Sequence, residues 1–188
     1  KSKAQRSFIN SEKLLKLGIE TPEPIAWLEF RDRFGFITHS YYISLYQEHA
    51  FTFEGVFGKD LAAREDIIRD FAHYAWEQLH LKGVEHLDLG QGNILVRPHA
   101  ERWHFSLVDT NRMRFNRKKL RRRGFVNLRR LGGSPIEMSM LANYYAEAKN
   151  KNPFWGIIQL SFYKLRFQTL RSLRKAITKP FKYLLPAH

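Results

Sequence analysis

Apolar residues recur at helical spacing near the start of the chain and then give way to strand-like runs. Gln5 to Leu17 predicts a helix, and Gly18 follows it as a C-terminal stop. The prolines of Thr21-Pro22-Glu23-Pro24 disfavour helix in the residues before them and predict an extended connection. The apolar runs Ile25 to Phe30 and Phe34 to Ile43 flank a short polar turn, so they predict a β-hairpin.

The middle of the chain predicts a long helix followed by a second pair of strands. Apolar residues lie at helical spacing from Ala63 to Lys82, and Gly83 is a candidate C-cap. A short loop then leads into two apolar strands, Asn93 to Val96 and Trp103 to Val108. This helix therefore delivers the chain directly to a loop that starts near His86.

Two more helices are predicted in the last third of the chain. One covers Pro135 to Lys149, and the other runs from Phe154 to roughly Thr178, where Pro180 is expected to end it. The chain has 188 residues, of which 44% are hydrophobic, so one domain with a sizeable core is expected.

The absence of cysteine excludes a disulfide framework and a thiolate metal site, and it is compatible with a reducing cytoplasm. No apolar run approaches the length of a transmembrane span, and the first six residues lead into no signal-peptide core.

Charge is distributed unevenly along the chain. Residues 1–109 hold 13 Lys or Arg and 16 Asp or Glu, whereas residues 110–188 hold 19 and 2, which gives the overall charge of +14. A basic region of this kind can contact nucleic acid, an anionic membrane or a phosphorylated substrate. Composition alone does not choose among these three.

The run from His86 to Asn93 is the strongest candidate for chemistry. It has the form H-x-D-x-x-x-x-N before an apolar strand, which is the catalytic-loop pattern of the protein-kinase-like fold. Phosphoryl transfer needs a carboxylate that orients a hydroxyl and accepts its proton, and an oxygen ligand for Mg²⁺ one short loop away. Asp88 and Asn93 match these two needs, and Asp109 supplies a second carboxylate at the end of the following hairpin.

Each of these residues alone has a simpler interpretation, because an isolated HxD or a single Asp at a strand end is usually a turn or a cap. Here three polar groups have kinase spacing, an amphipathic segment precedes them and two apolar strands follow. Gly90 and Gly92 add backbone freedom beside Asn93. The combination favours a kinase-like phosphotransferase over a coincidental surface loop.

The catalytic loop, together with Val108-Asp109-Thr110-Asn111-Arg112-Met113-Arg114-Phe115, resembles the lipopolysaccharide kinases, which phosphorylate Kdo or heptose of the lipid A inner core. Residues 6–12 and 18–26 are similar to that family's helix and hairpin entry, so the resemblance covers nearly the whole chain. It implies an α+β, protein-kinase-like fold that is mostly the helical C-lobe. Residues 1–47 would be the remnant of the N-lobe (a helix, a β-hairpin and the hinge), and residues 48–188 the C-lobe with a basic C-terminal helix.

The same resemblance implies roles for individual residues. Asp88 would be the catalytic base and His86 would brace the loop, while Asn93 and Asp109 would hold Mg²⁺. Glu12 would be the helix glutamate that pairs with a strand lysine, and a solvated helix charge is an equal alternative for it. The strand end would offer its backbone to the adenine and two arginines would contact the acceptor; these residues are Ser44, Leu45, Tyr46 and Gln47, and Arg112 and Arg114.

The chain also departs from the protein-kinase pattern. Leu87 replaces the usual arginine, Gly90 replaces the usual loop lysine, and an Ala-Pro-Glu element is missing. These differences favour a sugar or another small acceptor over a protein. The sequence contains no glycine-rich phosphate loop and no Val-Ala-Ile-Lys-like strand, so we expect a small lobe that is truncated or naturally degenerate.

Two basic segments bear on the acceptor. Residues 112–130 contain ten Lys or Arg and no acid, which suits phosphate or carboxylate groups; the alternative is a solvated, partly disordered activation-type segment. The residue pattern of the last helix predicts either a helix that lies in a membrane interface or one that packs against the large lobe and exposes its basic side to solvent. Its basic face would comprise Lys164, Arg171, Lys175, Lys179 and Lys182, with Phe162, Leu165, Leu170, Leu173 and Ile177 largely opposite.

Together with the catalytic-loop motif, the resemblance implies ATP-dependent phosphorylation of a sugar hydroxyl (Kdo or heptose) on a lipopolysaccharide precursor, with ATP and Mg²⁺ as cofactors. The expected location is cytoplasmic and peripheral on a bacterial inner membrane. Expected partners are the lipid-linked sugar and an anionic membrane surface; no nucleic acid is expected, because no nucleic-acid-binding module is visible. The alternatives are a non-catalytic kinase-fold scaffold at the membrane, which the missing phosphate loop favours, and another small-molecule kinase.

Overall fold

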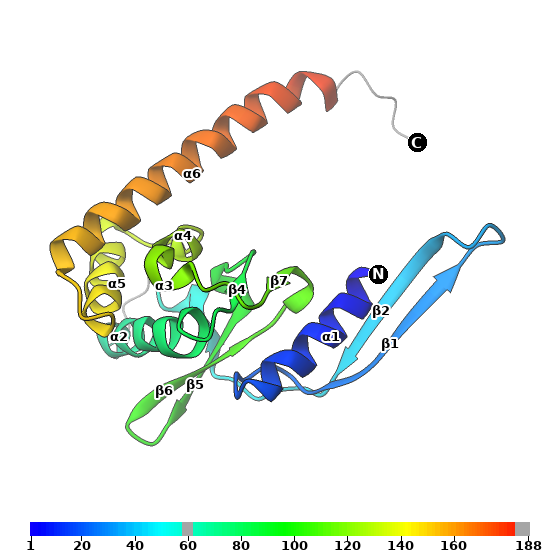
Figure 1. Cartoon of the computed structure of the whole chain (residues 1–188), viewed down its shortest axis with the longest axis horizontal. Coiled ribbons are helices and arrows are strands. Elements are labelled where there is room, and N and C mark those ends of the chain that lie inside the picture. The colour runs from blue at the N-terminus through cyan, green and yellow to red at the C-terminus, as the bar shows by residue number, and fades with distance from the viewer. Residues whose placement is uncertain (58–61, 183–188) are drawn as a thin grey trace.

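The computed structural model describes residues 1–57 and 62–182, with side chains described as far as Ile177. Figure 1 shows a helical body and a long β-hairpin that projects away from it. The N-terminal helix lies beside the hairpin, and the last helix starts at the outside of the body and then extends away from it.

The first helix and the hairpin form where the sequence predicts them. α1 (Lys3–Lys16) is capped by Ser2, whose hydroxyl oxygen accepts a hydrogen bond from a first-turn backbone N–H at 3.0 Å. Gly18 follows with φ of +67°, a backbone angle that glycine adopts without strain. β1 (Pro24–Arg31) and β2 (Ile37–Ser44) then pair antiparallel as a two-stranded sheet.

The predicted helix over residues 63–82 is present, but it has two parts. α2 (Arg64–Tyr74) is an α-helix, and η2 (Ala75–His80) continues it as a π-helix. A π segment shifts the side chains that follow it around the helix axis relative to a regular α-helix. α5 (Pro135–Ala148) packs against α2, and the reciprocal capping of Ser134 and the helix's third residue fixes its start.

The catalytic-loop region lies between short strands. β5 (Ile94–His99) and β6 (Arg102–Leu107) form the second predicted hairpin, and the short strand β3 (Phe51–Thr52) pairs with β5. β4 (Glu85–His86) pairs with β7 (Met113–Arg114), so the start of the loop lies beside the segment after Asp109. Three single 3₁₀ turns complete this region: η1 (Phe53–Gly55), η3 (Gln91–Asn93) and η4 (Thr110–Arg112).

The last part of the chain corrects the sequence-based prediction in one place. Two short helices, α3 (Leu120–Arg123) and α4 (Phe125–Leu128), lie within the basic run, and Arg121, Arg122 and Arg123 are exposed. The last helix, α6 (Pro153–Lys182), continues past Pro180. A proline removes one backbone donor, and this loss affects only the final turn of a helix that ends two residues later.

Aromatic side chains fill the centre of the body. The rings of Phe53 and Phe71 have centroids 4.4 Å apart, and Phe105 packs edge-on against Phe71 at 5.3 Å. All three are buried, so the η1 turn, α2 and β6 share one core. This core holds the β5–β6 hairpin, and with it the loop before β5, against the helices.

Glu20 joins the α1–hairpin region to this body. Its carboxylate accepts hydrogen bonds from Arg97 at 3.0 Å and Ser106 at 3.2 Å, and its backbone carbonyl accepts from Leu107 N–H at 3.0 Å. Partial burial acts to raise the pKa of Glu20, but the hydrogen bond and charge of Arg97 outweigh it and lower that pKa. A charged Glu20 therefore fastens the connection before β1 to the β5–β6 hairpin.

α6 departs from the predicted arrangement of its two faces. Lys164 is half-buried and donates to the Leu131 backbone carbonyl at 2.6 Å, so it does not belong to a free basic face. Lys179 and Lys182 lie outside the residues whose side chains are described. Within the described residues, no helix combines the length and the apolar composition needed to cross a bilayer.

Candidate active site

His86 ties the two halves of the candidate site together. It is fully buried; its Nε2 lies 3.0 Å from the Val108 carbonyl, and its Nδ1 lies 3.1 Å from the Asp88 backbone N–H. A carbonyl only accepts and an N–H only donates, so Nε2 carries the ring proton and Nδ1 accepts. Burial is the largest influence and lowers the pKa of His86, which keeps the ring in this neutral form. His86 therefore holds Asp88 next to the residue that precedes Asp109.

Asp88 is half-buried, and both of its carboxylate oxygens are engaged by arginines. Oδ1 lies 2.5 Å from Arg130 Nη1, and Oδ2 lies 3.3 Å from Arg112 Nη1. Arg130 follows α4, whereas Arg112 belongs to η4, so the two guanidinium groups come from different segments. A carboxylate oxygen in this position could accept a proton from a hydroxyl that replaces one arginine.

Asn93 is held by the same loop. Its side-chain Nδ2 donates to the Asp88 backbone carbonyl at 2.9 Å, and its own backbone carbonyl accepts from Val108 N–H at 3.0 Å. These bonds fix the amide orientation and leave Oδ1 without a partner among the described residues. Asn93 is thus bonded to Val108, the residue before Asp109, and presents its side-chain oxygen near the end of β6.

Asp109 stands at the turn that follows β6. Its backbone is left-handed, with φ of 53° and ψ of 48°, a conformation that Asp tolerates better than most residues. Asn111 lies in the η4 turn and donates from its side chain to Asp109 Oδ1. Asp109 is exposed, and its Oδ2 makes no hydrogen bond with the described residues.

The residue after Asp109 connects the site to α1 and the hairpin. Thr110 is buried, and its hydroxyl donates to the Ser7 carbonyl at 3.1 Å while lying 3.0 Å from Ser11 Oγ. Tyr42 of β2 donates to Ser11 Oγ at 3.1 Å, and Asn10 Nδ2 donates to the Thr110 carbonyl at 2.7 Å. α1 therefore fixes the position of the Asp109 turn.

The structure does not bring all predicted residues together. Glu12 lies on α1 and makes no ion pair or side-chain hydrogen bond with the described residues. The strand end contributes Leu45, Tyr46 and Gln47 to a separate cavity of about 780 Å³ that Asp88, Asn93 and Asp109 do not line. There, the Leu45 N–H is already bonded to the Glu23 carbonyl at 2.9 Å.

The two predicted acceptor arginines differ in position. Arg112 reaches Asp88, as described above. Arg114 lies in β7, where its guanidinium is 3.9 Å from the Glu85 carboxylate. Arg130, which the sequence did not single out within the basic run, makes the shortest contact with Asp88. Its spacing of 42 residues from Asp88 gives no local signal.

A buried polar network behind the loop was also missed. Asn127 Nδ2 donates to the His86 carbonyl at 2.7 Å, and its Oδ1 accepts from His80 Nε2 at 3.1 Å. His80 Nδ1 lies 2.6 Å from the Tyr145 hydroxyl, which donates to it. Burial lowers the pKa of His80 to about 4, so the ring is neutral. Residues of η2, α4 and α5 thus support the backbone of the loop. This network is visible only in the folded chain.

The donors present fit a magnesium ion bound together with a nucleotide. Among the described residues, no three His, Asp or Glu side chains cluster as a self-sufficient metal site. Mg²⁺ in phosphotransferases is instead held by one or two carboxylates plus substrate phosphates. One carboxylate oxygen of Asp109 and one amide oxygen of Asn93, both with open positions, match that kind of donor set.

Two of three comparisons with known proteins give a match. Residues 1–145 match the model of the lipopolysaccharide kinase (Kdo/WaaP) family. A solved structure described as WaaP in complex with acyl carrier protein is similar in fold, with a TM-score of 0.54, 17% identity, and coverage of 89% of this chain and 76% of that one. Comparison with curated protein sequences gives no match.

The structural similarity confirms the expected mixed α/β, kinase-like fold. The division into lobes at residue 47 stays a prediction. Because the family model covers most of the chain, including the His86–Asn93 loop and Asp109, the chain belongs to the lipopolysaccharide kinase (Kdo/WaaP) family and is a kinase.

Proposed function

We propose that this kinase transfers the γ-phosphoryl group of ATP to a sugar hydroxyl, of Kdo or heptose, in the inner core of lipopolysaccharide. One observation carries the proposal: hydrogen bonds through His86 and Asn93 join the Asp88 loop to the strand end at Asp109. This arrangement holds a proton acceptor and two open oxygen ligands on one rigid frame, as phosphoryl transfer requires.

Asp88 is the proton acceptor in this proposal. The acceptor hydroxyl donates to the Asp88 carboxylate, its oxygen forms a bond to the γ-phosphorus, and the bond between that phosphorus and the ADP oxygen breaks. The proton passes to Asp88. His86 stays neutral throughout, because its two ring nitrogens are used by Val108 and Asp88 backbone groups. His86 therefore positions the loop and takes no part in proton transfer.

Asn93 and Asp109 are the proposed magnesium ligands, and the ion they hold would neutralise charge on the transferred phosphoryl group. Support comes from their open oxygens and from the fixed orientation of both side chains. Glu12 and the backbone of Ser44, Leu45, Tyr46 and Gln47 remain proposals for nucleotide binding. The use of Leu45 N–H by Glu23 leaves fewer backbone groups there for an adenine.

The acceptor is proposed to be lipid-linked and anionic, with Arg112 and Arg114 contacting its phosphate or carboxylate groups. We place the enzyme on the cytoplasmic side of the inner membrane, as a peripheral protein. The apolar side chains of α6 support membrane contact, since they are more than half exposed: Phe162 (59%), Leu165 (66%), Leu173 (54%) and Ile177 (65%). An acyl carrier protein is a further candidate partner, because the similar WaaP structure contains one.

Replacement of the proposed base tests the function. Asp88→Asn in the full-length protein should lower kcat for a lipopolysaccharide acceptor by about a hundredfold or more, the scale of general-base loss. ATP affinity should change little. Asp66→Asn is a matched control, because Asp66 is an exposed carboxylate that also pairs with an arginine, at 2.7 Å from Arg69. Near-normal turnover by Asp88→Asn would remove Asp88 from the mechanism, whereas absence of turnover in the parent protein would favour the non-catalytic scaffold.

A further inference from the structure

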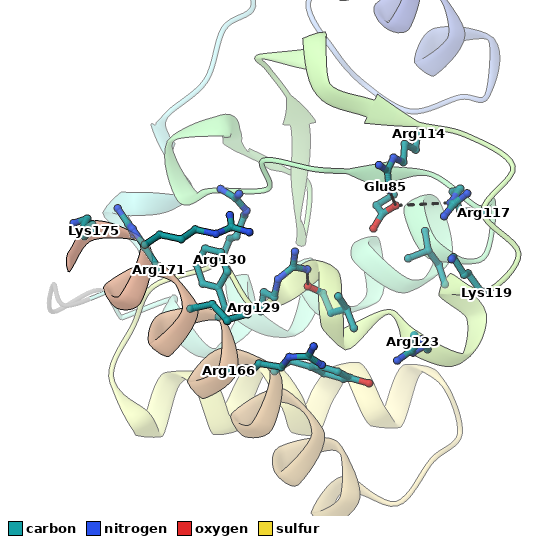
Figure 2. Close-up of a pocket in the computed structure, with 16 residues that line it drawn as sticks. Glu85, Arg114, Arg117, Lys119, Arg123, Arg129, Arg130, Arg166, Arg171 and Lys175 are labelled. Atoms are coloured by element: carbon teal, nitrogen blue, oxygen red, sulfur yellow. Dashed lines mark hydrogen bonds and ion pairs between the residues drawn. The ribbon is translucent and has the colours of Figure 1, made fainter. Parts of the chain in front are cut away.

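A large basic groove lies next to the candidate active site. It is a hollow of about 770 Å³ between residues 114–130 and the side of α6. Figure 2 shows Arg114, Arg117, Lys119 and Arg123 along one wall and Arg166, Arg171 and Lys175 on α6, with Arg129 and Arg130 between them. The α6 wall lies beyond residue 145, where the family match ends.

The charge of this groove is almost entirely of one sign. Its lining includes eight arginines and two lysines, and Glu85 is the one acid among its lining residues. Glu85 is 3.9 Å from both Arg114 and Arg117, so a single carboxylate serves two guanidinium groups. Burial is the main influence that lowers the pKa of Arg129, and the charge of Arg130 acts in the same direction. Such a concentration of cations is stabilised by a bound anion.

The groove also has an apolar floor. Its lining contains Tyr163, Phe167 and Leu170 of α6, and the guanidinium groups of Arg129 and Arg130 lie 5.5 and 5.1 Å from the Phe167 ring centroid. Leu170 belongs both to this floor and to the exposed apolar residues of α6. The cationic hollow therefore continues onto a surface suited to hydrocarbon.

Arg130 connects the groove to the catalytic loop. It lines the hollow, and its Nη1 is also 2.5 Å from Asp88 Oδ1. Its Nε is buried and lacks a hydrogen-bond partner among the described residues. A guanidinium has five N–H donors, so Arg130 can turn from Asp88 toward an anion in the groove.

We propose that this groove binds the phosphate or carboxylate substituents of the acceptor's headgroup, and that the bound anion draws Arg130 away from Asp88. Oδ1 is then open to the hydroxyl that is phosphorylated. Binding of the correct acceptor thus completes the site. This second step rests on the proposed role of Asp88, whereas anion binding in the groove does not.

Size and shape favour a small phosphorylated headgroup over an acidic protein or a nucleic acid. A hollow of this volume is typical of small-ligand sites, whereas protein and nucleic-acid partners need broader surfaces. Arginine forks suit phosphate and carboxylate oxygens. The adjoining apolar surface of α6 suits the acyl chains of such a lipid.

Calorimetry with a soluble probe tests the binding step. The probe is a deacylated glucosamine disaccharide with two phosphates, titrated into the full-length protein without nucleotide. Arg166→Gln/Arg171→Gln, which removes two charges from the α6 wall, should raise its Kd by about tenfold or more. Lys118→Gln/Arg122→Gln is the matched control, because these exposed residues carry the same charge and do not line the groove. The control should change Kd less than about twofold.

Three results would overturn the groove assignment. One is equal weakening by the two double variants, which would indicate unspecific attraction to a basic surface. Another is unchanged affinity in the wall variant. The third is failure of the disaccharide to bind while an acyl carrier protein or anionic vesicles bind in a manner that depends on Arg166 and Arg171.

Kinetics of Arg130→Gln test the release of Asp88. The parent enzyme should prefer the phosphorylated acceptor to the unphosphorylated sugar, and the variant should lose about tenfold or more of that preference in kcat/KM. An unchanged preference contradicts the release step.

The two arms separate this inference from the proposed function. Wall-dependent binding without any phosphoryl transfer would support the groove and refute the proposed function. Phosphoryl transfer to the sugar, with disaccharide binding that does not depend on Arg166 and Arg171, would support the proposed function and refute the groove.

Discussion

The side-chain amide of Asn127 donates a hydrogen bond to the backbone carbonyl of His86, with 2.7 Å between Nδ2 and the oxygen. The same side chain accepts from His80, so one buried residue supports both the loop and the π-helical segment behind it. Buried polar networks of this kind are strongly stabilising only when every member has its partner.

Asn127→Ala should therefore destabilise the fold and disturb the loop. It leaves the His80 Nε2–H and the His86 carbonyl without partners, which costs about 1–3 kcal/mol for each buried polar group. Urea denaturation measures the loss. Asn143→Ala is the control, because Asn143 makes an exposed hydrogen bond to Glu147 on α5. A loss no larger than that of the control would show that the network contributes little.

Gly124→Ala tests the packing of the same network. A Cβ at this position would lie 1.8 Å from the Tyr145 hydroxyl oxygen and 2.7 Å from His80 Nδ1, so both side chains must move. We expect a loss of about 1–3 kcal/mol in the free energy of unfolding. Gly55→Ala, whose nearest contact would be an ordinary 3.5 Å, should cost much less.

Removal of the Tyr145 hydroxyl supplies a second check on this interpretation. Gly124→Ala combined with Tyr145→Phe should recover part of the lost stability, since the closest clash disappears. Additive effects in the double variant would mean that the alanine acts through another contact.

The free energy of unfolding should decrease as the pH falls through a range set by His80. Burial lowers its folded-state pKa to about 4, below the usual histidine value of 6.5, so the unfolded chain binds a proton first as the pH falls. The contribution is present above pH 6.5 and is lost between about 6.5 and 4, on the order of 3 kcal/mol. Chemical denaturation at several pH values should show a shallower slope in His80→Gln. His73→Gln, which changes an exposed histidine, should keep the parent slope.

The proposed metal ligands should differ in strength. Asp109 offers a full negative charge and Asn93 only an amide oxygen, so Asp109→Ala should weaken binding of Mg·ATP more than Asn93→Ala. Calorimetric titration with a non-hydrolysable nucleotide gives both affinities. Binding of the nucleotide without Mg²⁺ should change little in either variant. The reverse order, or equal effects, would contradict the ligand assignment.

Contact with membranes should depend on the apolar side of α6. Replacing Phe162, Leu165 and Leu173 together by Ser should sharply reduce co-sedimentation with anionic vesicles, because exposed apolar area drives interfacial binding. A triple variant of the hairpin, at Ile25, Phe34 and Phe36, removes a similar exposed apolar surface elsewhere and should bind as the parent does. A larger loss of co-sedimentation in the hairpin variant would indicate that the hairpin, and not α6, contacts the membrane.

The sequence predicted local features well. The helix over residues 5–17, both hairpins and the α5 helix follow from periodicity and stop signals that act within a few residues. The His86–Asn93 motif was recognisable because all of its parts lie within one short loop. These predictions needed no knowledge of distant contacts.

Features that depend on distant residues were not predictable. The pairing of Asp88 with Arg130, and of Asn127 with His80, joins residues about 40 or more positions apart. No spacing rule distinguishes Arg130 from the nine other basic residues between positions 112 and 130. The π-helical turn at Ala75–His80 has no sequence signature, yet it is the segment that carries His80 into the network.

The β1–β2 hairpin has a consequence for how the protein behaves in concentrated solution. The two strands pair only with each other among the described residues, so each has an outer edge with unpaired backbone groups. Phe34 and Phe36 near its tip are 69% and 71% exposed, and residues 24–44 carry two acids and two arginines, which leaves this segment without net charge. Strand edges that carry exposed apolar side chains and no net charge tend to associate with one another. Despite the +14 charge of the whole chain, self-association should therefore begin at this hairpin, and a covering partner or mild detergent there would keep the protein dispersed.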